Sequence, residues 1–595
     1  MRTVRDTVID LLQRLDLTTI FSNPGSTEIP FLVDLPASIR FVLGLHESAA
    51  VGAAAGYALA RERPALVLLH TTAGLGNAVS ALATARVNRA PLVVLVGQQD
   101  RRHLAQAPFL AGKLQGLAGE YLVAVHQPVR PEDLPGTVVQ AREEAVTGRG
   151  PVTVVVPMDD WSAPAPEPHE IFGPRQVLRP AAVDAEAVKL IAGRLSAAVR
   201  PALVVGAGAD TAELWRDLPR LAEQLRAPVW QEAFSGRAGF PQDHRLFAGQ
   251  LPSERPGLRA ALHGHDVILT VGSGTYRQYP YADGPLVEPG TAILLISEDP
   301  EEIHRSIAEV AVLATPGAFI AALLSVMAGG GGFPGWTGAD PHRMPQGPAA
   351  EAEVPAAARL GAAAGPAHIL RQETKLTAPG EPALLAAASA CAPASLTAAG
   401  HGESRRAASA GMSAGRVLAV LGGLVTADTV ILEEAPSHKA ELHRRLLIRR
   451  PGGFLTPAMG GLGFSLPAAV GVRLACPDRP VMAVLGDGSS LYCIQGLWTA
   501  VSYEVGVLFV VLANGAYGIM DQLAARAGGT GPWPRLTGVS VAAIAAGFGC
   551  EAIRVENEPD LLNVARQVLP GLRSRRAPLL LEVAVEPGTG TPGSA

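Results

Sequence analysis

The sequence predicts an α/β fold with three doubly wound parallel-sheet domains and a long low-complexity linker before the third. Short apolar runs of strand length alternate with helix-like stretches, and this alternation recurs in three separate blocks of the chain. The runs are almost continuously apolar, which is typical of parallel strands that helices cover on both faces. The length of 595 residues is also sufficient for three or four domains of about 100–200 residues each.

The first block spans residues 1–165 and begins with a predicted helix. In "MRTVRDTVIDLLQRLDL", Val4, Val8, Leu11 and Leu12 have the spacing of an amphipathic helix. Further along the block, strands are expected at 40–45, 64–71, 91–99 and 151–157, and helices at 47–61 and 76–89. This order of elements is that of a parallel sheet with crossover helices.

The second block, 180–327, follows the Pro-rich stretch "APAPEPHEIFGPRQVLRP" (163–180). Strands are expected at 201–210, 266–274 and 292–299. The segment "VVGAGAD" lacks the full G-x-G-x-x-G pattern, so we expect no nucleotide or flavin in this central domain. Residues 328–411 are rich in Ala, Gly, Pro, Ser and Glu, which predicts a linker or insertion with at most a marginal helix.

The third block spans 412–586 and is followed by a tail, 587–595. Its apolar runs "VMAVL" and "VLFVVLAN" predict two strands, joined by a helix that begins near Ser489. Asp487 and Asn514 then lie at the carboxyl ends of the two strands, where open α/β sheets bind ligands. A carboxylate oxygen, a carboxamide oxygen and a backbone carbonyl of "GAYG" suit Mg²⁺. Asp487 alone would be read as a helix cap, but the Asn-Gly at the next strand end favours a ligand site.

Composition excludes several classes of partner. The formal net charge is −5 and the basic residues are scattered, so we expect neither a nucleic-acid nor an anionic membrane partner. The four cysteines show no metal-ligand spacing and no disulfide framework, and Cys493 is read as a small buried hydrophobe. The first helix lacks the apolar core of a secretory signal, and no run approaches the roughly 18 residues of a membrane span. A cytoplasmic location is expected.

Several stretches carry a resemblance to a known family. They are "GDGSSLY" with "NGAYG", "NPGSTEIPFL" (23–32), "LHESAAVGAAAGYA" (45–58), "LLHTTAGLGNAVSAL" (68–82), "GQQDRR" (97–102) and "GGLGFSLPAAVGV" (460–472). Together they resemble the thiamine diphosphate (ThDP) enzymes, and among these the benzoylformate decarboxylases. The resemblance implies ThDP and Mg²⁺ as cofactors. It also implies a homodimer at minimum, and a tetramer as a dimer of dimers, in which Glu47 and Asp487 around one cofactor come from different subunits.

The resemblance assigns roles to single residues. Glu47 matches the glutamate that hydrogen-bonds N1′ of the aminopyrimidine and favours its imino tautomer; desolvation among apolar neighbours favours proton sharing by such a carboxylate. Leu462 matches the apolar residue that keeps the cofactor bent, and Gly460 the carbonyl that accepts from the 4′-amino group. Ser26 matches a contact to the substrate carboxylate, and His70 a proton donor or acceptor. An isolated Ser26 would be read as a turn residue, and an isolated His70 as a core histidine.

The remaining implied positions contact the cofactor or the metal ion. The stretch "NPGSTEIPFL" supplies Asn23, Pro24 and Gly25. The diphosphate contacts are expected from the third block, namely Gly486, Asp487, Gly488, Ser489, Tyr492, Asn514 and Tyr517, with Ser437 as a weaker candidate. The expected Mg²⁺ ligands are Asp487, Asn514 and the carbonyl of Ala516.

The sequence departs from the family at one place. The decarboxylases carry a second histidine in the tract that corresponds to "SGTYRQYPY" (273–281), where this chain has Tyr279, or Gln278 if the register shifts by one. Tyrosine, with an ordinary pKa of about 10, is a poorer proton shuttle near neutral pH. Either Tyr279 or a water substitutes, or protonation after decarboxylation is slow and an aldehyde intercepts the intermediate.

The sequence therefore predicts an enzyme, with several possible outcomes of its chemistry. The leading hypothesis is non-oxidative decarboxylation of an aryl or otherwise bulky 2-oxo acid to an aldehyde. The second is a carboligase that forms an α-hydroxyketone, as acetolactate-synthase-like relatives do. A flavin- or NAD-dependent oxidoreductase and a catalytically idle relative are the remaining alternatives, and the presence of Glu47, Asp487 and Asn514 argues against the last.

Overall fold

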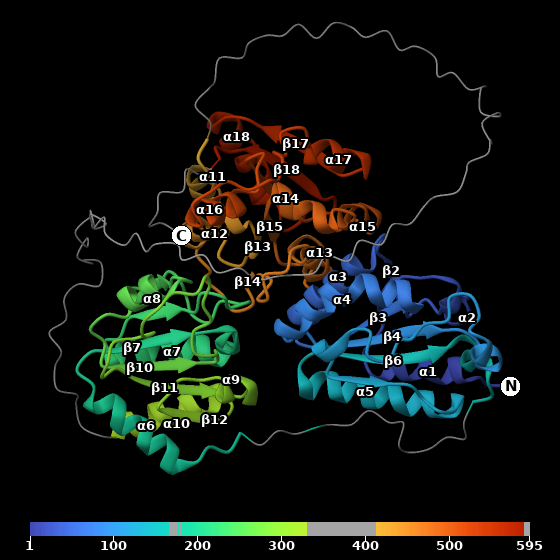
Figure 1. The fold of residues 1–595 in the computed structure, drawn as a ribbon, viewed down its shortest axis with the longest axis horizontal. Coiled ribbons are helices and arrows are strands. Elements are labelled where there is room, and N and C mark those ends of the chain that lie inside the picture. The colour runs from blue at the N-terminus through green and yellow to red at the C-terminus, as the bar shows by residue number, and fades with distance from the viewer. Residues whose placement is uncertain (166–176, 178–180, 330–411, 588–595) are drawn as a thin grey trace, which may run out of the picture. The chain divides into compact units, whose positions relative to one another are not determined.

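The computed structural model describes residues 1–165, 177, 181–329 and 412–587. These residues form three six-stranded sheets, and every strand pairing within them is parallel. Helices flank each sheet (Figure 1), which confirms the predicted α/β fold class. The described parts of the chain hold no helix that is long and apolar enough to cross a membrane.

The first sheet has the strand order β2-β1-β3-β4-β6-β5. Its strands are β1 (Thr19–Asn23), β2 (Arg40–Leu43), β3 (Ala65–His70), β4 (Leu92–Gln98), β5 (Ala124–His126) and β6 (Pro151–Pro157). Its helices are α1 (Val4–Arg14), α2 (Ile29–Leu32), α3 (Glu47–Arg61), α4 (Thr71–Val87) and α5 (Leu134–Gly148). Helix α1 begins at a capping box of Thr3 and Asp6, and its apolar side chains are buried as the sequence predicts.

The central sheet has the strand order β12-β11-β10-β7-β8-β9. Its strands are β7 (Pro201–Val205), β8 (Val229–Gln231), β9 (Phe247–Gln250), β10 (Val267–Val271), β11 (Ala292–Ser297) and β12 (Val310–Leu313). Its helices are α6 (Ala185–Ala197), α7 (Ala212–Leu225), α8 (Arg255–Ala261), α9 (Pro300–His304) and α10 (Pro316–Gly329).

The third sheet has the strand order β14-β13-β15-β16-β18-β17, which repeats the order of the first sheet. Its strands are β13 (Val430–Glu434), β14 (Phe454–Leu455), β15 (Val481–Gly486), β16 (Leu508–Ala513), β17 (Glu551–Val555) and β18 (Leu579–Ala584). Its helices are α11 (Ala414–Gly422), α12 (Lys439–Arg445), α13 (Ser465–Ala475), α14 (Asp487–Ser490), α15 (Gly496–Ser502), α16 (Gly518–Arg526), α17 (Val541–Gly547) and α18 (Glu558–Val568).

Several sequence-based boundaries need correction. The helix expected at 76–89 begins at Thr71, and the strand expected at 201–210 ends at Val205. Residues 328 and 329, which composition assigns to the linker, complete α10; the remaining predicted linker residues, 330–411, lie outside the described residues. The helix expected to begin near Ser489 is wrong in its start and its continuity. It begins at Asp487, because the Ser489 hydroxyl accepts the Gly486 N–H and closes the first turn there, and a 3₁₀ turn separates α14 from α15.

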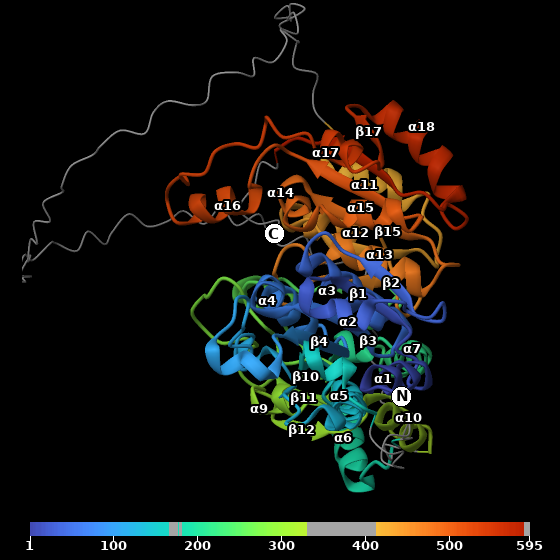
Figure 2. The same ribbon diagram turned by 90° about the vertical axis from the view of Figure 1, so that its right-hand side faces the viewer.

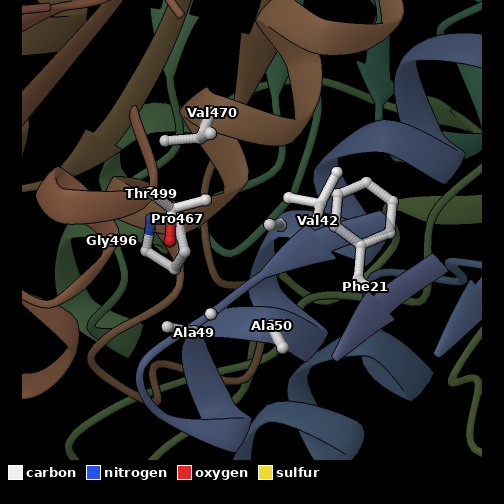
Figure 3. A pocket seen from close by; sticks show the side chains of 10 residues that line it. Phe21, Val42, Ala49, Ala50, Pro467, Val470, Gly496 and Thr499 are labelled. Carbon is white, nitrogen blue, oxygen red and sulfur yellow. The ribbon is translucent and has the colours of Figure 1, made fainter. Parts of the chain in front are cut away.

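Helices α3 and α13 join the first and third domains of the chain. They lie side by side (Figure 2), and glycines allow their backbones to approach closely. A Cβ on Gly56 would lie 2.2 Å from the carbonyl oxygen of Ala468, and one on Gly471 would lie 1.8 Å from that of Ala53. Figure 3 shows the cavity that remains beside this contact, about 10 Å³ in volume, which is room for about one water.

Candidate functional site

The predicted site residues lie where the strand order reverses in the first and third sheets. In the first sheet, β1 pairs with β2 on one side and with β3 on the other, so the loops after β1 and β3 diverge. The same arrangement recurs in the third sheet at β13 and β15. Open α/β sheets bind ligands outside the carboxyl ends of strands at such reversals.

Glu47 is the first residue of α3 and is only 7% exposed. Each of its carboxylate oxygens accepts one carboxamide N–H. The Nδ2 of Asn23, at the end of β1, lies 3.1 Å from Oε1, and the Nδ2 of Asn77, on α4, lies 3.0 Å from Oε2. The two amides fix the orientation of the carboxylate, while each oxygen retains a lone pair for a ligand.

His70 ends β3 and contacts the loop that follows β1. Its Nδ1 lies 3.0 Å from Oε2 of Glu28 and 2.9 Å from Oγ1 of Thr27. The Glu28 carboxylate is buried and also accepts the Gly25 N–H at 2.8 Å. A Cβ on Gly25 would lie 2.4 Å from the imidazole, so the glycine leaves the space that the ring occupies. Ser26, the first residue of the short helix after Gly25, is exposed, and Pro24 is half-buried.

Asp487 and Asn514 come together at the edge of the third sheet, because β15 and β16 are paired neighbours. Asp487 Oδ2 accepts the Gly515 N–H at 2.7 Å and Oδ1 accepts the Gly488 N–H at 2.8 Å. Burial raises the pKa of Asp487, and these backbone N–H groups oppose that rise. Asn514 Oδ1 accepts the Ala516 N–H at 2.9 Å, which folds the loop back over its own side chain.

The donor set at this edge fits Mg²⁺ better than a transition metal. In the described portion of the chain, no group of three or more His, Cys, Asp or Glu side chains gathers as a metal centre. Mg²⁺ needs no such group, since one carboxylate, neutral oxygens, phosphates and water complete its octahedron. Asp487, the Asn514 amide oxygen and the Ala516 carbonyl are a set of this kind.

Side chains around this edge pack closely against two glycines. A Cβ on Gly518 would lie 2.9 Å from Oγ of Ser437, and one on Gly488 would lie 3.1 Å from the Tyr517 ring. Ser437, the weaker candidate from the sequence, thus lies beside the predicted metal site. The Ser489 hydroxyl donates to the carbonyl oxygen of Glu434 at 2.5 Å, so its side chain fastens α14 to β13.

Leu462 lies in a glycine-rich loop that is hydrogen-bonded to the side chain of Glu434. Glu434, the last residue of β13, accepts three backbone N–H groups, from Gly463 at 2.6 Å, Phe464 at 2.9 Å and Ser465 at 2.7 Å. Its full burial raises its pKa to about 7. Leu462 itself is half-buried and, with residues of both domains, lines a cavity of about 100 Å³, whose other walls include Ser48, Ser80, Thr84, Tyr492 and Cys493.

Comparison with known proteins identifies the family of this chain. Profiles of thiamine pyrophosphate enzymes match three stretches: the N-terminal TPP binding domain at 2–118, the central domain at 188–323 and the C-terminal TPP binding domain at 435–583. The chain is 35% identical over 590 residues to benzoylformate decarboxylase from Pseudomonas aeruginosa, covering 98% of this chain and 99% of that protein. The chain belongs to the thiamine diphosphate-dependent enzymes.

Solved structures of the family have the same fold. Benzoylformate decarboxylase from Polynucleobacter necessarius is 30% identical, covers 99% of both chains and superposes with a TM-score of 0.83. The ThDP-dependent 4-hydroxybenzoylformate decarboxylase of Rhodococcus jostii RHA1 is also 30% identical, with a TM-score of 0.81 and coverage of 98% and 99%. Membership of the family makes this chain a ThDP-binding enzyme.

Sequence reasoning missed three carboxylate or amide side chains that hold the predicted residues. Glu28 contacts His70, Asn77 contacts Glu47, and Glu434 holds the loop that carries Leu462. For Glu434 the available signal was its place at the end of an apolar run, since a buried carboxylate needs partners, whereas Glu28 and Asn77 carried no such signal. In the divergent tract, Tyr279 is 57% exposed, whereas Gln278 Oε1 accepts from Arg255. The role of Tyr279 stays a prediction.

The central domain uses its glycines for packing. A Cβ on Gly206 would lie 2.3 Å from Cβ of Ser273, and one on Gly208 would lie 2.9 Å from Cα of Gly272. The loop after β10 therefore occupies the space beside the loop after β7, which is where a dinucleotide-binding sheet of this strand order would place a pyrophosphate. The absence of a bound nucleotide in the central domain stays a prediction.

Proposed function

We propose that this enzyme is a Mg²⁺- and ThDP-dependent decarboxylase of an aryl or otherwise bulky 2-oxo acid. The observation that carries the proposal is the placement of polar groups in two sheets. Glu47, held by two amides, lies at the strand reversal of the first sheet, while Asp487 and Asn514 lie beside that of the third sheet. Full-length similarity to benzoylformate decarboxylases supports the aryl substrate class. When bound, ThDP supplies the electron sink that makes loss of CO₂ feasible.

Each of the predicted site residues would have its own role in binding the cofactor. Asp487, Asn514 and the Ala516 carbonyl would hold Mg²⁺ and, through it, the diphosphate. Glu47 would share a proton with the pyrimidine ring, because its two amide partners fix its direction and its burial excludes bulk water. Leu462 would contact the cofactor from the loop that Glu434 anchors.

His70 would move the proton on the substrate side. If Nδ1 carries a proton toward the buried Glu28 carboxylate, Nε2 is the ring atom that accepts or gives a proton. Ser26, exposed on the neighbouring turn, would bind the substrate carboxylate. General acid–base groups placed in this way contribute roughly 10²–10⁴-fold to rate.

We also propose that the site is completed by a second subunit, in a dimer at minimum and a tetramer as a dimer of dimers. The cavity beside Leu462 measures about 100 Å³, whereas ligand pockets are typically about 300–1,000 Å³. Large apolar side chains next to predicted site residues are exposed, namely Leu45 at 41%, Met459 at 40%, Tyr492 at 57% and Met520 at 42%. A second subunit would cover these exposed apolar side chains. Active monomers in light scattering would contradict the proposal.

A carboligase is the second candidate, and the tract around Tyr279 favours it. No histidine occurs in residues 273–281, so proton delivery to the intermediate after CO₂ loss depends on other groups. A slower protonation step would give an aldehyde acceptor time to react and yield an α-hydroxyketone.

One experiment separates the candidates. The protein is incubated with ThDP, Mg²⁺ and benzoylformate, with and without added benzaldehyde, and CO₂ and organic products are measured. A gain of benzaldehyde equal to the CO₂ released in both arms supports the decarboxylase, whereas an α-hydroxyketone in place of that gain in the second arm supports the carboligase. Glu47→Gln, which keeps the size of the side chain, should abolish turnover while ThDP still binds.

Chelation of Mg²⁺ should weaken ThDP binding, and added Mg²⁺ should restore ThDP binding in the wild type but not in Asp487→Ala. A yellow protein would favour a flavin enzyme instead.

A further inference from the structure

Asn88, directly after α4 in the first domain, uses its whole carboxamide to hold a loop of the third domain. Its Nδ2 donates to the carbonyl oxygen of Thr456 at 3.0 Å, and its Oδ1 accepts the Ala458 N–H at 2.9 Å. The side chain is 8% exposed, so both bonds are shielded from water. One side chain thus satisfies two buried backbone groups two residues apart, as a neighbouring strand would.

The held residues lead directly into the loop that carries Gly460 and Leu462. The Gly460 N–H donates to the carbonyl oxygen of Pro457 at 2.8 Å, so the turn that follows is built on the segment that Asn88 fixes. Gly461 lies beside α4 as well, since a Cβ there would be 3.2 Å from Oγ1 of Thr84. Thr84 precedes Asn88 by one helical turn, so both contacts come from the same face of α4.

The loop itself has little intrinsic rigidity. Gly460 has φ +77° and Gly463 has φ +95°, and the sequence "GGLG" contains only one residue with a side chain. Glycines lose more conformational freedom than other residues when they are fixed, so such a loop needs anchors at both ends. Glu434 bonds the end at 463–465, and Asn88 bonds the end at 456–458, where the Thr456 N–H also donates to the Gly236 carbonyl and Arg277 donates to the Ala458 carbonyl.

We propose that Asn88 is a positioning residue for ThDP binding, acting through Thr456 and Ala458 to hold Gly460 and Leu462 in the binding arrangement. The proposal rests on the function proposed above. A ligand that meets a fixed loop pays no ordering cost, whereas a loop released at one end must be ordered by the ligand at the expense of affinity.

The neighbouring residue provides a matched control. Arg89 also bridges two domains, since its guanidinium donates to Asp299 and to Glu302 of the central domain, each at 2.7 Å. It makes no hydrogen bond to residues 456–463 among those recorded for the described chain. Arg89→Met therefore removes an inter-domain contact of similar size from the same turn without releasing the loop.

The test compares Asn88→Ala with Arg89→Met in two measurements. Calorimetry with Mg²⁺ should show ThDP binding about tenfold weaker in Asn88→Ala, from the loss of two hydrogen bonds, and unchanged in Arg89→Met. Hydrogen–deuterium exchange of the cofactor-free protein should be faster at residues 459–464 in Asn88→Ala alone. KM for benzoylformate should remain that of the wild type. If Asn88→Ala does not fold, Asn88→Asp, which keeps the acceptor for Ala458, should show the same changes.

The outcomes separate the two proposals. Wild-type affinity and wild-type exchange in Asn88→Ala would overturn the positioning role, and so would equal losses in Arg89→Met. If the wild type itself failed to bind ThDP, the proposed function would fall. Exchange at 459–464 would still decide whether Asn88 fixes the loop.

Discussion

Removal of the Glu434 carboxylate should destabilise the third domain and weaken ThDP binding together. In Glu434→Ala, the backbone N–H groups of Gly463, Phe464 and Ser465 lose their shared acceptor, and all three residues are buried. A buried donor without a partner costs about 1–3 kcal/mol. Three such donors give a loss of at least about 3 kcal/mol even where water reaches part of the space.

Glu433 provides the control, because it lies next in the same strand and is equally buried. Its carboxylate accepts the Ala435 N–H and the Thr456 hydroxyl, both at 2.8 Å. The hydroxyl can rotate to another acceptor, so Glu433→Ala orphans a single backbone donor and should cost about 1–3 kcal/mol. Glu434→Ala should therefore be destabilised two- to threefold more than Glu433→Ala.

The assay is calorimetric unfolding with and without ThDP and Mg²⁺. For a domain of 150–250 residues, about 3 kcal/mol corresponds to a fall in Tm of roughly 6–12 °C. Glu434→Ala should show this fall and should also gain less stabilisation from saturating ThDP than Glu433→Ala does, since its freed N–H groups adjoin Leu462. Equal melting temperatures for the two variants, or full ThDP stabilisation of Glu434→Ala, would refute the assigned role of the three hydrogen bonds.

Three further predictions concern the titration of Glu434, the Glu28 carboxylate and the contact between α3 and α13. Burial raises the pKa of Glu434 from 4.5 to about 7, so the stability that its protonated form contributes is present below about pH 4.5 and is lost as pH rises through 7. Glu434→Gln cannot ionise, so its free energy of unfolding should not show this loss. Parallel pH profiles of the two proteins in denaturant titrations would disprove this prediction. Glu28→Gln should lower kcat by at least about tenfold with little change in ThDP affinity, because it removes the buried carboxylate that orients the His70 ring. An unchanged kcat in steady-state kinetics would show that Glu28 does not orient His70 for catalysis. Gly56→Ala should destabilise the protein by about 2 kcal/mol or more at the α3–α13 contact, because the new Cβ would lie 2.2 Å from the Ala468 carbonyl oxygen. Gly193→Ala in α6 is the control, because a Cβ there meets no atom within 4 Å. In the same thermal unfolding assay this control should be neutral or stabilising.

Continuously apolar runs could be predicted as strands, but several strands were not expected, among them β1 and β18 and the short β5 and β14. Runs such as "PLVVLVGQQ" and "PVTVVVP" are apolar along their length because helices cover both faces of the sheet, and they appear as β4 and β6. β5 has three residues and β14 has two, and neither run is long enough to carry a periodicity. Their place at the sheet edges is set by pairing with β6 and β13, which is a tertiary contact.

For the site, the sequence by itself determined which strand ends carry the polar residues of the predicted site. Asp487 and Asn514 could be predicted because each directly follows an apolar run, and Glu47 because its motif resembles the family. The tertiary structure decided how these groups are held. Glu28 reaches His70, Asn77 reaches Glu47 and Asn88 reaches Thr456 only because chain folding brings distant segments together. The physical reason is that burial and hydrogen-bond partners depend on distance in space, whereas a sequence pattern records only neighbours along the chain.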